Sequence, residues 1–225
     1  MVRPDKYVSS IGKWYFGPYD PSGYSAPVIR LAAAAIAVKN DKTGAKITWN
    51  AVDNASKYYI YRKTSSSGWT LIKATTELSY IDTTAAAGTA YQYCINAMDS
   101  ADGAGPDSNI VTNAFVGYTA CKVKNTASGV TISWSKTTGA TGYRIYYRAD
   151  SSASWKGWKN VAATSVTDSF AAGKYYEYLI RPYVTTGGTT YYGYWDNTLS
   201  DGVIRLAAPA ITVKNAADGV NISWK

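Results

Sequence analysis

The stretch AVKNDKTGAKITWN (37–50) occurs twice more in this chain of 225 residues, as KVKNTASGVTISWS (122–135) and as TVKNAADGVNISWK (212–225). One asparagine marks the same point of each copy: Asn40, Asn125 and Asn215. They are 85 and 90 residues apart (125 − 40 and 215 − 125), too far for a small solenoid repeat but suitable for a seven-stranded sandwich. Each period therefore predicts one domain.

Each copy has the pattern of a β-hairpin. A first strand ends at Lys-Asn, a turn containing Gly follows, and a second strand alternates apolar and polar residues up to a tryptophan. The equivalent tryptophans are Trp49, Trp134 and Trp224. We expect all three to lie in a domain core.

Two more segments repeat downstream of the first two hairpins. SKYYIYRKT (56–64) aligns with GYRIYYRAD (142–150), and AAGTAYQYCINA (86–97) aligns with AAGKYYEYLIRP (171–182). Alternating side chains point to opposite faces of a strand, so both pairs predict half-buried strands. The residues expected on their inner faces are Tyr58, Ile60, Tyr91, Tyr143, Ile145 and Tyr176.

These motifs resemble tandem fibronectin type III repeats. The shared features are Trp in the second strand, Gly-Tyr-x-Ile-x-Tyr in the third (142–147), and Tyr-x-Tyr-x-Ile in the sixth, where Tyr91 and Tyr176 resemble a tyrosine corner. LAAPAITVKNAADGVNISW (206–224) resembles the variant found in large surface proteins of Gram-positive bacteria. The resemblance implies an all-β fold of seven-stranded, immunoglobulin-like sandwiches. It does not decide the function, because such domains serve as spacers, adhesive modules and enzyme-flanking units.

The repeats divide the chain into four parts. VIRLAA occurs at 28–33 and at 203–208, each time leading into the first strand of a new unit. We expect the last two strands of a preceding unit, two complete domains, and the first two strands of a following unit, with these limits: 1–30, 31–115, 116–206 and 207–225. The partial units predict either an excerpt of a longer repeat protein or a chain whose ends pair with neighbouring copies.

The composition argues against catalysis. Histidine is absent, which removes Ser-His and Cys-His nucleophile pairs and His-ligated zinc, and the only glutamates are Glu77 and Glu177. Cys94 and Cys121 fall in different domains and are expected to stay unpaired. We expect no enzyme activity and no cofactor. A membrane-inserted segment is not expected, because the chain has no run of about 20 apolar residues. The +8 charge is scattered and predicts no specific nucleic-acid binding.

Two candidate sites stand out. An aromatic platform for sugar rings would use Tyr146 with Trp155 and Trp158. Trp158 aligns with Trp69 and is expected to pack in the fourth strand of both units, whereas Trp155 has no counterpart and is expected to be the more exposed ring. Tyr146 is expected on the outer face of its strand, beside arginines that support the face. The carboxylates of the 99–109 loop could bind calcium, but their spacing fits no known loop, and tight turns also require Asp. These carboxylates are Asp99, Asp102 and Asp107.

Together these features predict a non-catalytic extracellular spacer or adhesion stalk, at a bacterial cell surface or secreted. Its partners would be other domains of the same protein, identical chains joined by strand pairing, or cell-wall polymers and glycans, which the positive charge favours. Two alternatives remain open: a carbohydrate-binding module, and a filament subunit whose terminal half-domains are completed by neighbouring chains.

Overall fold

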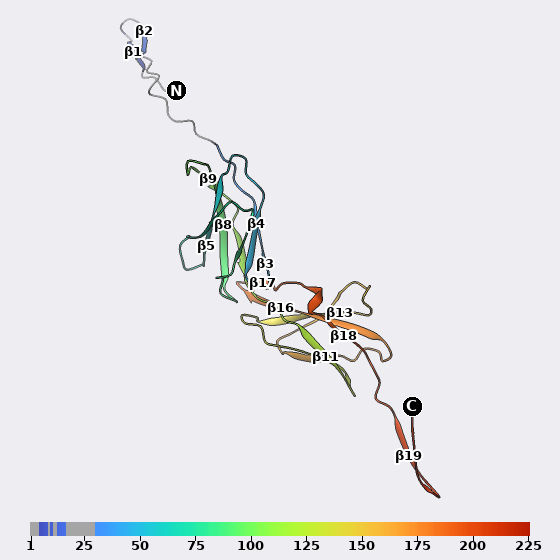
Figure 1. The fold of residues 1–225 in the computed structure, drawn as a ribbon. Coiled ribbons are helices and arrows are strands. Elements are labelled where there is room, and N and C mark those ends of the chain that lie inside the picture. Colours follow the sequence, from blue (N-terminus) through green and yellow to red (C-terminus); the bar gives the residue numbers. More distant parts are fainter. Residues whose placement is uncertain (1–4, 9, 11–12, 17–29) are drawn as a thin grey trace.

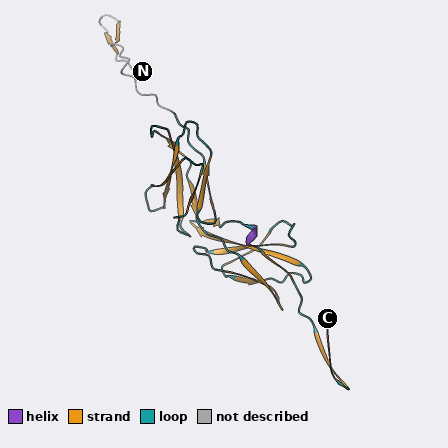
Figure 2. Ribbon diagram, in the orientation of Figure 1, coloured by secondary structure: helices purple, strands orange, loops and turns teal. Residues whose placement is uncertain are grey.

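A computed structural model describes residues 5–8, 10, 13–16 and 30–225 (Figure 1). Nearly all regular structure in them is strand, and the one helical element is a short 3-10 turn, η2 (Asn197–Leu199), drawn in purple in Figure 2. Within these residues no helix is both long and apolar enough to cross a membrane.

The first complete unit consists of two facing antiparallel sheets. One sheet has the order β3-β4-β7, and the other has the order β10-β8-β5-β6 with β9 also paired to β8. The strands are β3 (Ile36–Asn40), β4 (Ala45–Trp49), β5 (Lys57–Lys63), β6 (Thr70–Thr75), β7 (Ser79–Asp82), β8 (Ala90–Met98), β9 (Ala104–Asp107) and β10 (Val111–Ala114).

The second unit repeats this arrangement with one long strand. Its sheets have the orders β11-β12-β15 and β14-β13-β16-β17, and β18 pairs with the other end of β16. The strands are β11 (Cys121–Thr126), β12 (Gly129–Trp134), β13 (Gly142–Arg148), β14 (Lys156–Val161), β15 (Ser165–Thr167), β16 (Tyr175–Thr186), β17 (Thr189–Tyr192) and β18 (Asp201–Ile204). The chain is therefore all-β, with tandem fibronectin type III-like sandwiches, as the repeats predicted.

The cores form where the alternation predicted them. The Trp49 and Tyr58 rings lie 5.5 Å apart in the first unit, and the Trp134 and Tyr143 rings lie 5.4 Å apart in the second. The residues Ile60, Ile145 and Tyr176 are also buried. Apolar area removed from water stabilises each sandwich at roughly 25 cal/mol per Å².

The second tyrosine of each Tyr-x-Tyr motif has a role that the sequence did not indicate, while the tyrosine-corner assignment of Tyr91 and Tyr176 stays a prediction. Tyr91 is half-buried and packs against the first core, while the fully buried tyrosine of β8 is Tyr93. The Tyr93 hydroxyl donates to Asp82 Oδ2 at 3.0 Å, and the equivalent Tyr178 hydroxyl donates to Asp168 Oδ2. Each of these hydroxyls therefore connects the sixth strand of its unit to a buried carboxylate at the end of a strand of the facing sheet.

Two isolated hairpins flank the sandwiches. β1 (Asp5–Val8) pairs with β2 (Lys13–Phe16), and β19 (Ile211–Ala216) pairs with β20 (Gly219–Trp224). Most of the predicted partial unit 1–30 lies outside the described residues, and the four domain limits stay predictions.

Trp224 does not lie in a core, contrary to expectation. It pairs with Ile211, as Trp49 pairs with Ile36, yet it is 71% exposed. The reason is that no second sheet faces the β19–β20 hairpin among the described residues. The hairpin forms locally, whereas burial of its tryptophan requires a partner sheet.

Candidate binding site

The outer face of β13 and β16 carries the charged and aromatic side chains that the alternation predicted. Arg144, Tyr146 and Arg148 are directly opposite Arg181, Leu179 and Glu177 in the antiparallel register. Arg148 Nε donates to Glu177 Oε2 at 2.7 Å. This hydrogen bond lowers the pKa of Glu177; burial opposes the shift, and a second hydrogen bond from Ser200 adds to it.

An aromatic cluster covers part of this face. The Trp195 ring lies 4.7 Å from Tyr146 and 6.1 Å from Trp155, both edge-on. The Nε1 groups of both tryptophans donate to Asn197 Oδ1, at 2.9 Å from Trp195 and 3.0 Å from Trp155. The half-buried Trp155 is therefore packed and hydrogen-bonded, with only part of its ring free for a ligand.

Trp158 belongs to the core and does not contribute to the platform. A register shift in β14 lies between the partners of Ile145 and Tyr146, and Trp158 packs against the second core with its ring 5.2 Å from Phe170. The bulge therefore separates Trp158 from Tyr146.

The same register corrects the sequence alignment of the tryptophans. Counting from the strand pairs, Trp155 corresponds to Trp69 and Trp158 to Ile72. Equivalent cations support this assignment: Lys63 lies over Trp69 at 4.7 Å, and the Arg148 guanidinium lies over Trp155 at 4.6 Å. Matching the two Gly-Trp pairs was misleading because the connection before the strand differs in length between the units.

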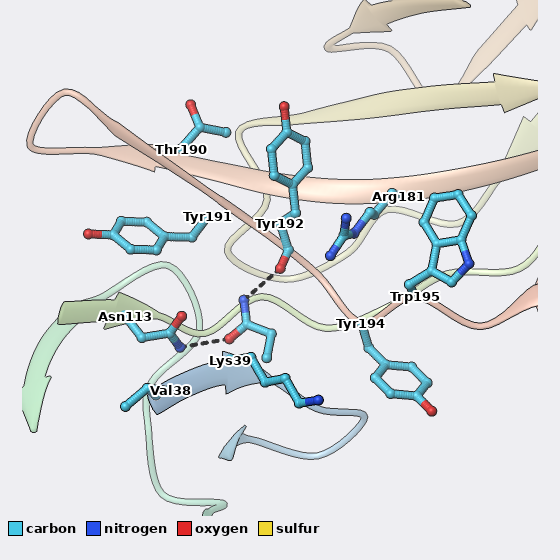
Figure 3. A pocket seen from close by; sticks show the side chains of 10 residues that line it. Val38, Lys39, Asn113, Arg181, Thr190, Tyr191, Tyr192, Tyr194 and Trp195 are labelled. Carbon is cyan, nitrogen blue, oxygen red and sulfur yellow. Dashed lines mark hydrogen bonds between the residues drawn. The ribbon is translucent and has the colours of Figure 1, made fainter. Parts of the chain in front are cut away.

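A pocket of about 390 Å³ lies at the junction of the two units; we call it the junction pocket (Figure 3). The first unit contributes Asn113 and the end of β3. The second unit contributes Arg181 and the aromatic run that follows β16. The main lining residues are Lys39, Asn40, Arg181, Tyr192, Tyr194 and Trp195.

Asn40 connects the units at the floor of this pocket. Its Nδ2 donates to the Ala114 carbonyl of its own unit and to the Tyr192 carbonyl of the next, both at 3.0 Å, and Asn113 donates to its Oδ1 at 2.8 Å. The repeated Asn125 likewise donates to the Ile204 carbonyl at 2.8 Å. The repeated asparagine therefore ties the first strand of a unit to its last strand.

Further contacts hold the junction together. Ala114, Val116 and Val184 form a small buried cluster between the units. Lys42 Nζ lies 2.9 Å from Asp196 Oδ2, and this hydrogen bond, with others from Thr198, lowers the pKa of Asp196 to about 2.

A backbone contact adds to the junction. A Cβ on Gly139 would come within 2.5 Å of the backbone at Ala87 and Gly88, so only glycine fits there.

The acidic loop residues are engaged in structural contacts. Asp99 accepts backbone hydrogen bonds from Ala101 and Gly103, Asp102 forms an ion pair with Lys57, and Asp107 accepts from Asn96. Among the described residues, no three acidic, His or Cys side chains group closely enough to hold a metal ion. Turn formation therefore accounts for Asp99, while Asp102 and Asp107 contact side chains of β5 and β8.

Both cysteines are buried and unpaired. Burial raises the pKa of the Cys94 thiol to about 11 and that of the Cys121 thiol to about 12. Since the thiolate is the reactive form, neither side chain has the microenvironment of a nucleophile.

Comparisons with known proteins give partial similarities. No family model matches the chain. A 70-residue stretch is 37% identical to a poly(3-hydroxybutyrate) depolymerase of Ralstonia pickettii; it is 31% of this chain and only 13% of the depolymerase. A two-domain fibronectin type III segment of chicken tenascin covers 78% of this chain and 99% of its own length, at 14% identity and a TM-score of 0.41. A Fn3-like protein from Clostridium thermocellum covers 40% of this chain and 95% of its own length, at 29% identity and a TM-score of 0.33.

Sequence reasoning missed two residues of this region. Trp195 was not singled out, although it closes the aromatic run YYGYW (191–195). Asn40 was used only to measure the repeat. The aromatic run was a usable signal for the first, whereas nothing in a single unit indicates that Asn40 also contacts the following one.

Proposed function

We propose that the chain is a non-catalytic part of an extracellular spacer or adhesion stalk, at a bacterial surface or secreted, in which neighbouring sandwiches keep a set angle. The observation that carries this proposal is the double hydrogen bond of Asn40, which joins β3 both to its own unit and to Tyr192 of the next. The buried cluster around Val116 and the close approach at Gly139 support it. A packed junction restricts the relative motion of two domains, which a small, polar interface usually permits.

The arrangement of the units suits a spacer more than an enzyme. The described residues form an elongated series with β19 beyond the second sandwich (Figure 1). Spacing and display would therefore be the task of these units, with no substrate turned over.

A spin-label distance measurement tests the proposal. Labels at Ser65→Cys and Ser151→Cys would sit on exposed positions of the first and second units, while the buried native thiols react poorly. We expect one narrow distance distribution from the unmodified junction. Asn40→Ala should broaden it, because the bond to Tyr192 is lost.

Asn125→Ala is the matched control, since it removes the equivalent bond to Ile204 within the second unit and leaves the junction intact. A broad distribution without any junction substitution would refute a set angle. So would a distribution that Asn40→Ala and Asn125→Ala affect equally.

A further inference from the structure

Two arginines of the second unit lie directly opposite each other without a compensating acid. Arg144 of β13 pairs in register with Arg181 of β16, and within the described residues neither is within ion-pair distance of a carboxylate. Like charges opposite each other in a sheet are destabilising. The first unit has Tyr59 and Asn96 at the equivalent pair, so the fold does not require this charge.

The side chain of Arg181 is held in place with most of its donors unused. Its Nε donates to the Gly193 carbonyl at 2.8 Å, and its guanidinium lies 5.2 Å from the Tyr192 ring and 5.7 Å from the Trp195 ring. A guanidinium has five N–H donors in a planar fork that matches a carboxylate. Among the residues that the structure describes, Arg181 donates hydrogen bonds only through Nε, which leaves the outer fork for a ligand.

Arg181 faces the junction pocket together with Tyr192 and Trp195 (Figure 3). The charged residues of the pocket lining are Arg181 and Lys39, both cationic. The neighbouring Lys42 is already paired with Asp196. The pocket thus combines positive charge, a free planar fork and half-exposed aromatic rings.

We propose that the junction pocket binds an acidic oligosaccharide, with a sugar carboxylate on the Arg181 fork and the sugar ring against Trp195 or Tyr192. Charge-assisted bidentate hydrogen bonds are among the strongest that a side chain forms, and the aromatic rings provide a flat apolar surface for the sugar. The first unit adds Lys39 to the lining, which would give the acidic sugar a second cation.

The test uses the full chain and calorimetric titration. The probes are tetragalacturonate, its methyl ester, which keeps the rings without the charge, and inorganic phosphate, which has charge without a ring. We expect tetragalacturonate to bind at least tenfold more tightly than either of the other two. Equal affinity for all three, or no binding of tetragalacturonate, would overturn the proposal.

Substitutions locate the site. Arg181→Gln should weaken tetragalacturonate binding at least tenfold, and Trp195→Ala should weaken it by a smaller factor. Lys124→Gln, on the exposed face of the opposite sheet, removes the same charge and should change binding less than twofold. Circular dichroism checks the fold of each variant, and Arg181→Lys keeps the charge without the fork. Unchanged affinity in folded Arg181→Gln and Arg181→Lys would overturn the assignment of Arg181.

Discussion

The two sandwiches surround an equivalent buried aspartate with different side chains. Each buries an aspartate where the third strand of its three-stranded sheet ends: Asp82 is the last residue of β7, and Asp168 directly follows β15. In the first unit Arg62 Nη1 donates to Asp82 at 2.7 Å and to Thr84 at 2.9 Å.

In the second unit the positions of Arg62 and Thr84 are occupied by Tyr147 and Phe170. Their rings pack 4.7 Å apart. The remaining donors to Asp168 are the Tyr178 hydroxyl and backbone N–H groups at 3.3 and 3.4 Å. A polar pair and an aromatic pair thus replace each other at one site.

On the outer faces it is the second unit that has the ion pair. The second unit has an ion pair between Arg148 and Glu177 where the first has Lys63 opposite Gln92. The ion pair of the first unit, Arg62–Asp82, bridges its two sheets, whereas that of the second unit, Arg148–Glu177, lies on the outer face of one sheet. Both units keep the buried aspartate and its tyrosine, while the third partner differs between them.

The largest expected effect comes from Arg62→Ala. It leaves the fully buried Asp82 without its cation, and breaking a buried pair costs about 3 kcal/mol or more. Hydrogen exchange of the β8 amides should accelerate accordingly, while the β16 amides serve as an internal control. A loss below about 1 kcal/mol would contradict the role given to Arg62.

A double substitution sharpens this result. Arg62→Tyr with Thr84→Phe gives the first unit the aromatic pair of the second. We expect the double variant to be more stable than the sum of the single changes predicts, by about 1 kcal/mol, because contacting residues couple. Additive single effects would show that the two pairs are not interchangeable.

Tyr178→Phe should have the next largest effect. It leaves Asp168 with only long backbone hydrogen bonds, at a cost of about 2 kcal/mol for an under-satisfied buried group. Tyr93→Phe should cost about half as much, since Asp82 keeps Arg62 and Thr84. Equal losses, measured by exchange in β16 and β8, would remove the distinction between the units.

Arg148→Ala should destabilise the second unit by about 1.5 kcal/mol, the lower end for a hydrogen bond to a charged group. The pair with Glu177 lies on the outer face of the sheet with both side chains mostly covered, and the guanidinium also covers Trp155. Lys63→Ala in the first unit is the matched control and should have a smaller effect, because Gln92 carries no charge. A denaturation series in low and high salt should show a salt dependence for Arg148 only.

The smallest expected effect is a difference between the two units in the pH at which each begins to lose stability. Hydrogen bonding to Arg148 lowers the folded-state pKa of Glu177 from 4.5, so its contribution is present above that value and lost as pH falls through the lowered pKa. Burial raises the pKa of Asp82, but hydrogen bonds from Thr84, Arg62 and Tyr93 together lower it below 3.8. The Glu177 contribution should therefore begin to fade at a higher pH than that of Asp82. Glu177→Gln should abolish the early phase, and an unchanged acid profile in that variant would contradict this order.

Much of the fold could be predicted from residue patterns. The repeat spacing, the Gly turns and the alternation placed Trp49, Trp134, Tyr58 and Tyr143 correctly, because hairpins and strand faces depend on local sequence. The site was predicted only in part. Tyr146 was assigned to the correct face and Trp158 to a packed position, but Trp155 was wrongly given no counterpart, since the register of β14 matches it to Trp69.

The sequence by itself determined the repeating sandwiches, their buried tryptophans and the outward arginines, since each of these follows from a short periodic pattern. Only the tertiary structure decided that Asn40 reaches Tyr192, that Trp195 covers Tyr146 and Trp155, and that Trp224 stays exposed. The physical reason is distance along the chain. Contacts between residues up to 152 positions apart depend on how whole sheets and units pack, which local periodicity does not encode.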